Sequence, residues 1–284
     1  MSKSIRPPAV AGSFYPAEPK QLAQKINKYL AAAKVNVTAE KIRAIMVPHA
    51  GYDFSGPVAA YAYAAIVGRK FRTVVLIGSS HTSYFDGSVI DDHDAWQTAL
   101  GAVEIDKELA AKIMAREEKI KMLSSVHEQD HMIEVQLPWL QTVLAPGFKI
   151  VPIALGNMEQ KNYRQLADAL FEVLTEEDLL VVSSDMSHYP AYDDAKKIDR
   201  RTLELIEQGK VGELDEYVAA TMAAGIPGEE TLLCGLEAVK TGLDLAQKLN
   251  WQAKILRYAT SGDVPIGSKD SVVGYGAVVF TNKK

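Results

Sequence analysis

The residues best suited to chemistry are one cysteine and a set of histidines. Cys234 is the only cysteine in the chain, so it cannot form an intrachain disulfide, which leaves packing, reactivity or metal ligation as its roles. His49 and His81 each follow a hydrophobic run typical of a buried strand, and an Asp185-x-x-His188 pair follows another such run. Because ligands bind beyond the carboxyl ends of the strands in open α/β sheets, these side chains are expected to meet there. Imidazole is the commonest metal ligand, and the sequence therefore indicates a metal site that the cysteine would complete.

The elements that must position these residues alternate between strand and helix. Four short runs rich in branched residues, each followed by Pro, Gly or Ser, predict central strands of a mainly parallel sheet with helices on both faces. Two extended segments near the C-terminus are predicted to pair as a hairpin or as adjacent strands. The predicted strands are Ile42–Val47, Thr73–Ile77, Lys149–Leu155, Leu179–Ser183, Ala253–Thr260 and Ser271–Phe280, and the predicted helices lie near 55–68, 106–116, 131–144, 159–174, 191–208, 212–223 and 229–248.

Cys234 has two interpretations at this stage. Free cysteine often packs as a small hydrophobic residue, and for an isolated cysteine that role is the more common one. Against this, Cys234 lies in the first turns of a helix predicted to begin near Gly228, where the partial positive charge of the helix end favours the thiolate. Spacing alone leaves both interpretations open.

His131 and Glu134 form a further motif. Their i, i+3 spacing would place them on one face of a helix, which Pro138 is expected to bend. The pair is interpreted as lying behind the metal ligands or facing a substrate, with a solvated helix face as the equal alternative. His93 and His127 lack supporting context and are predicted to be structural or exposed.

Composition narrows the class of protein. The chain has 284 residues, of which 48% are hydrophobic and 24% charged, as is usual for a globular protein. A formal charge of −5 gives no reason to expect binding to nucleic acid or to an anionic membrane, and no run approaches the ~18 apolar residues that span a bilayer. With no linker in view, residues 1–284 are predicted to form a single α/β domain. The free thiol predicts a location in the reducing cytoplasm.

Six short motifs, in order through nearly the whole chain, together resemble the Memo family. They are Pro7–Pro16, Pro48–Tyr52, Gly78-x-x-His81, His131-x-x-Glu-x-Gln-Leu-Pro138, Ser183-Ser-Asp-x-x-His188 and Ser271–Ala277. The resemblance implies a fold like the catalytic subunit of class III extradiol dioxygenases, which use non-haem Fe(II). It also implies a functional link to a radical-SAM protein, beside which similar prokaryotic proteins are encoded. The eukaryotic relative is associated with cell motility, phosphotyrosine peptides, and redox, copper or iron handling.

Residue by residue, the resemblance assigns roles to the same side chains. His49 and His81 match the two histidine ligands of the dioxygenase-like site, and Cys234 matches the position of its carboxylate ligand. His188 matches the acid/base histidine, with Asp185 beside it. A thiolate is a softer ligand than a carboxylate and favours Cu(I) or Zn more strongly.

Three functions are consistent with these residues. The first is a metal-dependent oxidoreductase with Fe(II) or copper, or zinc as a third candidate. The second is a non-catalytic module that binds a peptide or a small molecule in the inherited pocket, supported by aromatic residues in the motif loops. The third is a copper or iron chaperone that uses the same ligands. Tyr52 is among these aromatic residues and is interpreted, like His131 and Glu134, as lying behind the ligands or facing a substrate.

Overall fold

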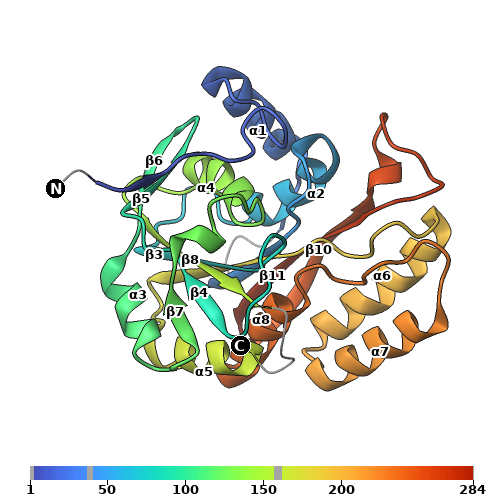
Figure 1. Cartoon of the computed structure of the whole chain (residues 1–284). Helices are drawn as coiled ribbons and strands as arrows, with labels where there is room; N and C mark the ends of the chain where they lie inside the picture. Colours follow the sequence, from blue (N-terminus) through green and yellow to red (C-terminus); the bar gives the residue numbers. More distant parts are fainter. Residues whose placement is uncertain (1–2, 37–40, 157–161, 284) are drawn as a thin grey trace.

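The computed structural model describes residues 3–36, 41–156 and 162–283, which form an eight-stranded sheet, a three-stranded sheet and helices around them (Figure 1). The large sheet has the strand order β10-β11-β2-β9-β3-β8-β4-β7 and the small sheet the order β1-β5-β6. The strands are β1 (Ile5–Arg6), β2 (Ile42–Val47), β3 (Thr73–Ser79), β4 (Ser88–Ile90), β5 (Ala95–Thr98), β6 (Gly101–Glu104), β7 (Ile120–Met122), β8 (Lys149–Leu155), β9 (Asp178–Ser183), β10 (Trp251–Thr260) and β11 (Gly274–Asn282).

Helices cover both faces of the large sheet, as Figure 1 shows. Side chains alternate between the faces along a strand, so Ile45 and Val47 pack with α1, α2 and α4, while Ala44 and Met46 pack with α3, α5, α6 and α8. The helices are α1 (Pro19–Ala32), α2 (Tyr52–Ala64), α3 (Lys107–Met114), α4 (Leu137–Val143), α5 (Asn162–Val173), α6 (Tyr192–Glu207), α7 (Val211–Ala224) and α8 (Leu236–Lys248), with short 3-10 turns η1 (Ser124–Val126), η2 (Glu134–Gln136) and η3 (Ser261–Asp263).

The four central strands, β2, β9, β3 and β8, run parallel and are buried along almost their whole length. Strands covered on both faces need continuous apolar runs, and this is why the sequence pattern predicted them. The C-terminal pair β10 and β11 is antiparallel, which confirms the predicted pairing, and β11 adds to the edge of β2. The mixed α/β class with a mostly parallel sheet is therefore confirmed.

One helix prediction in this part of the chain needs correction. The helix predicted near 131–144 begins only at Leu137, because Pro138 lacks the N–H that an interior helical residue donates and so occupies the first turn instead. His131 consequently precedes the helix rather than lying on it. The start of the helix predicted near 159–174 falls outside the described residues, and its described part is α5.

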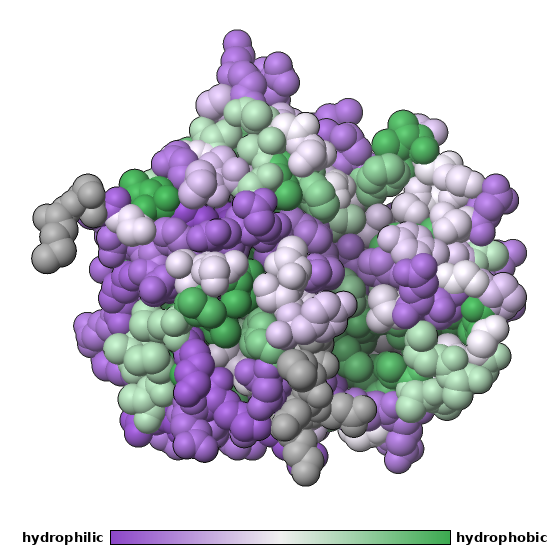
Figure 2. All heavy atoms as spheres, viewed as in Figure 1, coloured by the Kyte–Doolittle hydropathy of each residue, from purple (hydrophilic) through white to green (hydrophobic). Residues whose placement is uncertain are grey.

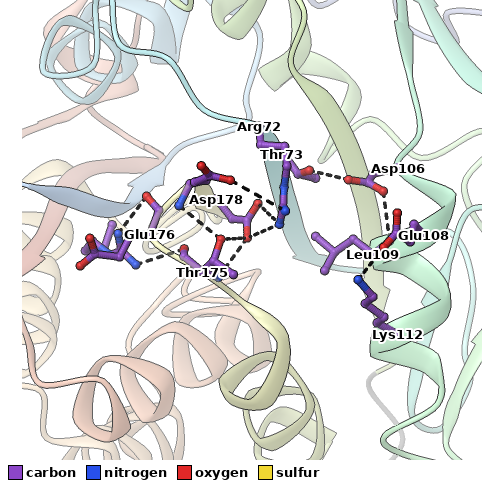
Figure 3. Close-up of polar contacts among 11 residues, drawn as sticks. Arg72, Thr73, Asp106, Glu108, Leu109, Lys112, Thr175, Glu176 and Asp178 are labelled. Atoms are coloured by element: carbon purple, nitrogen blue, oxygen red, sulfur yellow. Dashed lines mark hydrogen bonds and ion pairs between the residues drawn. The ribbon is translucent and has the colours of Figure 1, made fainter.

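The amino ends of β3 and β9 are tied together by polar contacts (Figure 3). Arg72 donates to both carboxylate oxygens of Asp178 at 3.1 Å, and Thr175 donates to the same carboxylate. Thr73 donates to Asp106 at the start of α3. These contacts lie at the amino ends of the strands. The histidine-bearing loops follow the carboxyl ends, on the opposite edge of the sheet.

The surface includes an apolar area over α7, which appears pale green at the lower right of Figure 2. The helix contains the sequence Val-Ala-Ala-Thr-Met-Ala-Ala, and Met222 in it is exposed. At 14 residues, α7 is shorter than the roughly 20 residues that cross a bilayer. Among residues 3–36, 41–156 and 162–283, no helix combines the length and apolar character of a membrane span.

Candidate metal centre

Three loops meet at the carboxyl edge of the sheet because the strands before them end level with one another. Val47 at the end of β2 pairs with Ser183 at the end of β9, and Gly78 of β3 pairs with the same Ser183. The loops that follow carry His49, His81 and the Asp185–His188 segment. The predicted convergence of these strand ends is therefore present.

The fourth segment brings Cys234 to this edge, although not on a helix as the sequence predicted. The helix predicted from about 229 begins at Leu236, and Cys234 lies before it. His188 pairs in a β-bridge with Thr231. The chain at Thr231, ahead of the helix, is therefore extended against the loop that follows β9 and is not helical. Gly235 then packs so closely on that loop that a Cβ atom there would lie 2.6 Å from the carbonyl oxygen of Ser183.

The thiol and two imidazoles have the spacing of ligands to one ion. Cys234 Sγ lies 3.1 Å from His49 Nε2, and the ligand atoms of His49, His81 and Cys234 all lie within 4.8 Å of one another. Ligand atoms at about 2.0–2.3 Å from a common ion lie up to roughly 4.6 Å apart, so this donor set fits a metal with small adjustments. His49 is buried, whereas His81 is exposed at the rim.

The orientation of His49 is fixed from behind. Ser183 has a single hydroxyl hydrogen, which it donates to the carbonyl oxygen of Met132 at 2.6 Å. His49 Nδ1, 3.0 Å from the same hydroxyl oxygen, must then be the donor of that contact, which leaves the lone pair on Nε2 towards Cys234. Gln136 also donates to Ser183 Oγ, at 2.9 Å, and holds the hydroxyl in place.

Asp185 and His188 lie beside the thiol. Asp185 is buried, and its Oδ1 accepts the backbone N–H groups of His49 at 2.7 Å and Ala50 at 3.3 Å. Its own N–H donates to Cys234 Sγ at 3.2 Å. His188 Nδ1 lies 2.8 Å from the carbonyl oxygen of Met186, which can only accept, so Nδ1 carries the proton and Nε2 a free lone pair.

Burial shapes the protonation of this cluster. It holds the pKa of His49 well below 6.5, and the neighbouring histidines lower it further. Burial also raises the pKa of Asp185 to about 7 and, with the nearby Asp185 carboxylate, raises that of the Cys234 thiol. The His49 imidazole is thus in the neutral form that binds metal, while the thiol gives up its proton only when a cation is bound.

Comparisons with known proteins identify the family. A family model described as Memo-like protein matches residues 6–279. The chain belongs to the Memo-like family. It is 37% identical to a MEMO1 family protein of Saccharolobus solfataricus over 97% of this chain and 99% of the relative. It is 34% identical to a MEMO1 family protein of Methanopyrus kandleri over 97% of this chain and 98% of the relative.

In this Memo-like protein the candidate metal-ligand group opens into a cavity of about 450 Å³. His131 lines the cavity, and its ring lies 4.5 Å from that of Phe14. Burial and the neighbouring His81 lower the pKa of His131 to about 4, so this ring is neutral near pH 7. The lining residues are Phe14, His49, Ala50, Gly51, His81, His131, Asp185, His188, Tyr189, Glu230, Thr231, Cys234 and Val273.

Glu134 does not line this cavity and does not share a helix face with His131. It is fully buried in an ion pair with Arg6 at 2.7 Å. It also accepts the backbone N–H groups of Ala9 and Val10 and the Tyr15 hydroxyl. The motif glutamate of the Memo-like protein therefore fastens the N-terminal segment, which carries the cavity residue Phe14 into place.

Tyr52 also lies outside the cavity lining. It is buried, and its hydroxyl donates to the carbonyl oxygen of Val135 at 2.6 Å. His127 is buried as well, with Nε2 3.0 Å from the Val89 carbonyl oxygen, which agrees with the structural role predicted for it. His93 pairs with Asp91 at 2.7 Å, away from the cavity lining.

The residues that hold the candidate ligands of the Memo-like protein in place were not identified from the sequence. Asp130 accepts the backbone N–H of His81 at 2.8 Å, and Ser183 and Gln136 orient His49. All three lie within the family motifs or directly beside them, at Asp130-His131 and Ser183-Ser-Asp185. Their positions in the sequence, close to the candidate ligands, could have predicted this supporting role.

Proposed function

We propose that this Memo-family protein is a metal-dependent oxidoreductase whose redox metal is held by His49, His81 and Cys234. The observation that carries the proposal is the convergence of these ligand atoms within 4.8 Å, from three separate segments of the chain, with His49 presenting Nε2. Iron or copper is the preferred metal, because imidazole and thiolate suit both and both exchange electrons. Zinc fits the same donors but supplies no redox chemistry.

The neighbouring residues supply proton chemistry and position. His188 has a free Nε2 lone pair at the cavity, and we assign it the transfer of protons to and from a bound ligand. Asp185 holds the His49 backbone through Oδ1 and lines the same cavity, where it assists that transfer. When bound, the metal supplies the one-electron chemistry.

The proposal extends to the fold family and to the ligand. Histidine ligands after β2 and β3, the parallel strands on either side of β9, support a class III extradiol dioxygenase-like arrangement, with the thiolate in the carboxylate position. A cavity of about 450 Å³ has room for a small molecule or the end of a peptide. We place the protein in the cytoplasm, with a functional link to a radical-SAM protein by family resemblance.

Paired histidine variants test this assignment in protein loaded with one equivalent of metal. We expect His49→Ala to lower metal affinity by about 100-fold or more, because it removes a ligand rather than a residue behind one. His188→Ala should keep the affinity within about tenfold while lowering oxygen uptake with ascorbate as reductant by roughly 100-fold or more, as expected for loss of an acid/base group. Metal competition titrations and an oxygen electrode give the two measurements.

His93→Ala is the matched control, since that histidine lies outside the cavity lining. It should change neither quantity. An equal fall in affinity for the single equivalent of metal in His188→Ala and His49→Ala would show that His188 is a ligand and not a proton-transfer group. Tight metal binding without any oxygen uptake by the parent protein would favour a metal carrier or a ligand-binding module instead.

A further inference from the structure

The cavity contains a second group of metal-binding atoms. Those of Asp185, His188 and Cys234 lie within 4.8 Å of one another, and this group shares only Cys234 with the first. Two ligands of the same ion lie at most about 4.6 Å apart, since each is about 2.0–2.3 Å from it. The five residues form two groups of this size rather than one, so a single ion is not placed to contact all of them.

Each donor of the second group has a free lone pair. Asp185 Oδ1 accepts two backbone N–H groups, whereas its Oδ2 has no hydrogen-bond donor within the part of the chain that the structure describes. His188 is tied through Nδ1 to the carbonyl oxygen of Met186, which leaves Nε2 free. A thiolate at Cys234 carries enough lone pairs to bind two ions at once.

We propose that Asp185, His188 and Cys234 form a second metal position, in which the Cys234 thiolate bridges two ions. Carboxylate oxygen, imidazole nitrogen and thiolate sulfur are each ligands of zinc, so the second ion belongs to the zinc-like class of borderline divalent cations. It binds more weakly than the first ion, because its sulfur is shared between two positive charges.

The effect of this second metal position on turnover rests on the proposed function. An ion bound at His188 Nε2 occupies the lone pair that would accept a proton. A second equivalent of metal therefore inhibits the protein rather than activating it. The turnover of the protein would therefore depend on whether metal is supplied at more than one ion for each chain.

Counting bound ions tests the proposal without reference to turnover. Metal-stripped protein with its thiol reduced is titrated with Zn²⁺ in a calorimeter. We expect two equivalents in the parent, the second roughly tenfold or more weaker than the first. His188→Ala and Asp185→Asn should each bind one equivalent at the affinity of the first ion. Asparagine can keep the Oδ1 acceptor for the His49 N–H while it replaces the Oδ2 ligand by an NH2 group, which does not bind metal.

A third group, Asp91, Asp92 and His93, could also bind Zn²⁺, so binding there must be distinguished from binding at the second position. His93→Ala should still bind two equivalents, and a loss of the second ion in that variant would overturn the proposal. A parent that binds one ion, kept in His188→Ala and lost in His49→Ala, would overturn the second position while leaving the proposed function intact. Failure of the parent to bind any ion would remove both. His188→Gln replaces His188→Ala if thermal unfolding shows the alanine variant to be misfolded.

Discussion

Cys234→Ser is expected to lower Cu(I) affinity by several orders of magnitude. The thiolate is the soft ligand in the group, and an alcohol oxygen is a poor ligand for a soft ion. Serine has nearly the volume of cysteine, so packing around residue 234 should change little and the thermal unfolding midpoint should stay close to that of the parent. Competition against a Cu(I) chelator of known affinity measures the effect under anaerobic conditions.

Cys234→Glu makes this test selective for the metal. It places a carboxylate beside His49 and His81, the donor combination typical of non-haem Fe(II) sites. The variant should lose Cu(I) affinity as the serine variant does while gaining Fe(II) affinity relative to it. Unchanged binding of copper and iron by folded Cys234→Ser would mean that the thiol only packs, and the ligand-binding module would become the better account.

Glu134→Gln is expected to lower the free energy of unfolding by about 3–5 kcal/mol, because it leaves the fully buried Arg6 guanidinium without its countercharge. The same change replaces one of the two oxygens that accept the N–H groups of Ala9 and Val10 by an NH2 group, which cannot accept a hydrogen bond. Urea denaturation measures the loss. Limited proteolysis should also cut the N-terminal segment near Phe14 faster than in the parent.

Glu176→Gln is the control for the loss of a glutamate charge. Glu176 pairs with Lys41 at 3.1 Å, but both side chains are more than half exposed, so its removal should cost less than about 1 kcal/mol. If Glu134→Gln were as mild as this control, the Arg6–Glu134 pair would not be what fastens the N-terminal segment, and the position of Phe14 would need another cause.

The central strands and the histidine loops could be predicted from the sequence because a buried strand requires a continuous run of apolar residues. Strands such as Ile42–Val47 and Lys149–Leu155 are apolar along their length, and their observed bounds match the predicted ones. Since parallel strands end at one edge, the positions of His49 and His81 directly after their strands were enough to bring them together.

The remaining features depend on contacts between distant segments. Residues before Leu236 read as helical, but pairing of Thr231 with His188 keeps them extended, and this pairing has no local signal. Arg6 appears in the sequence as one more basic residue near the N-terminus, yet it is fully buried against Glu134. The short strands β1, β4, β5, β6 and β7 contain too few residues for a periodic pattern to develop.

Metal analysis of the untagged protein, purified without added metal, tests the central claim most directly. We expect a stoichiometric amount of iron or copper in the parent protein and its loss from His49→Ala and Cys234→Ser, with all three proteins folded. His93→Ala should retain the metal, because its side chain belongs to a different group. A parent protein that carries neither iron nor copper, and takes up neither when they are offered under reducing conditions, would contradict the claim that His49, His81 and Cys234 form a redox-metal site.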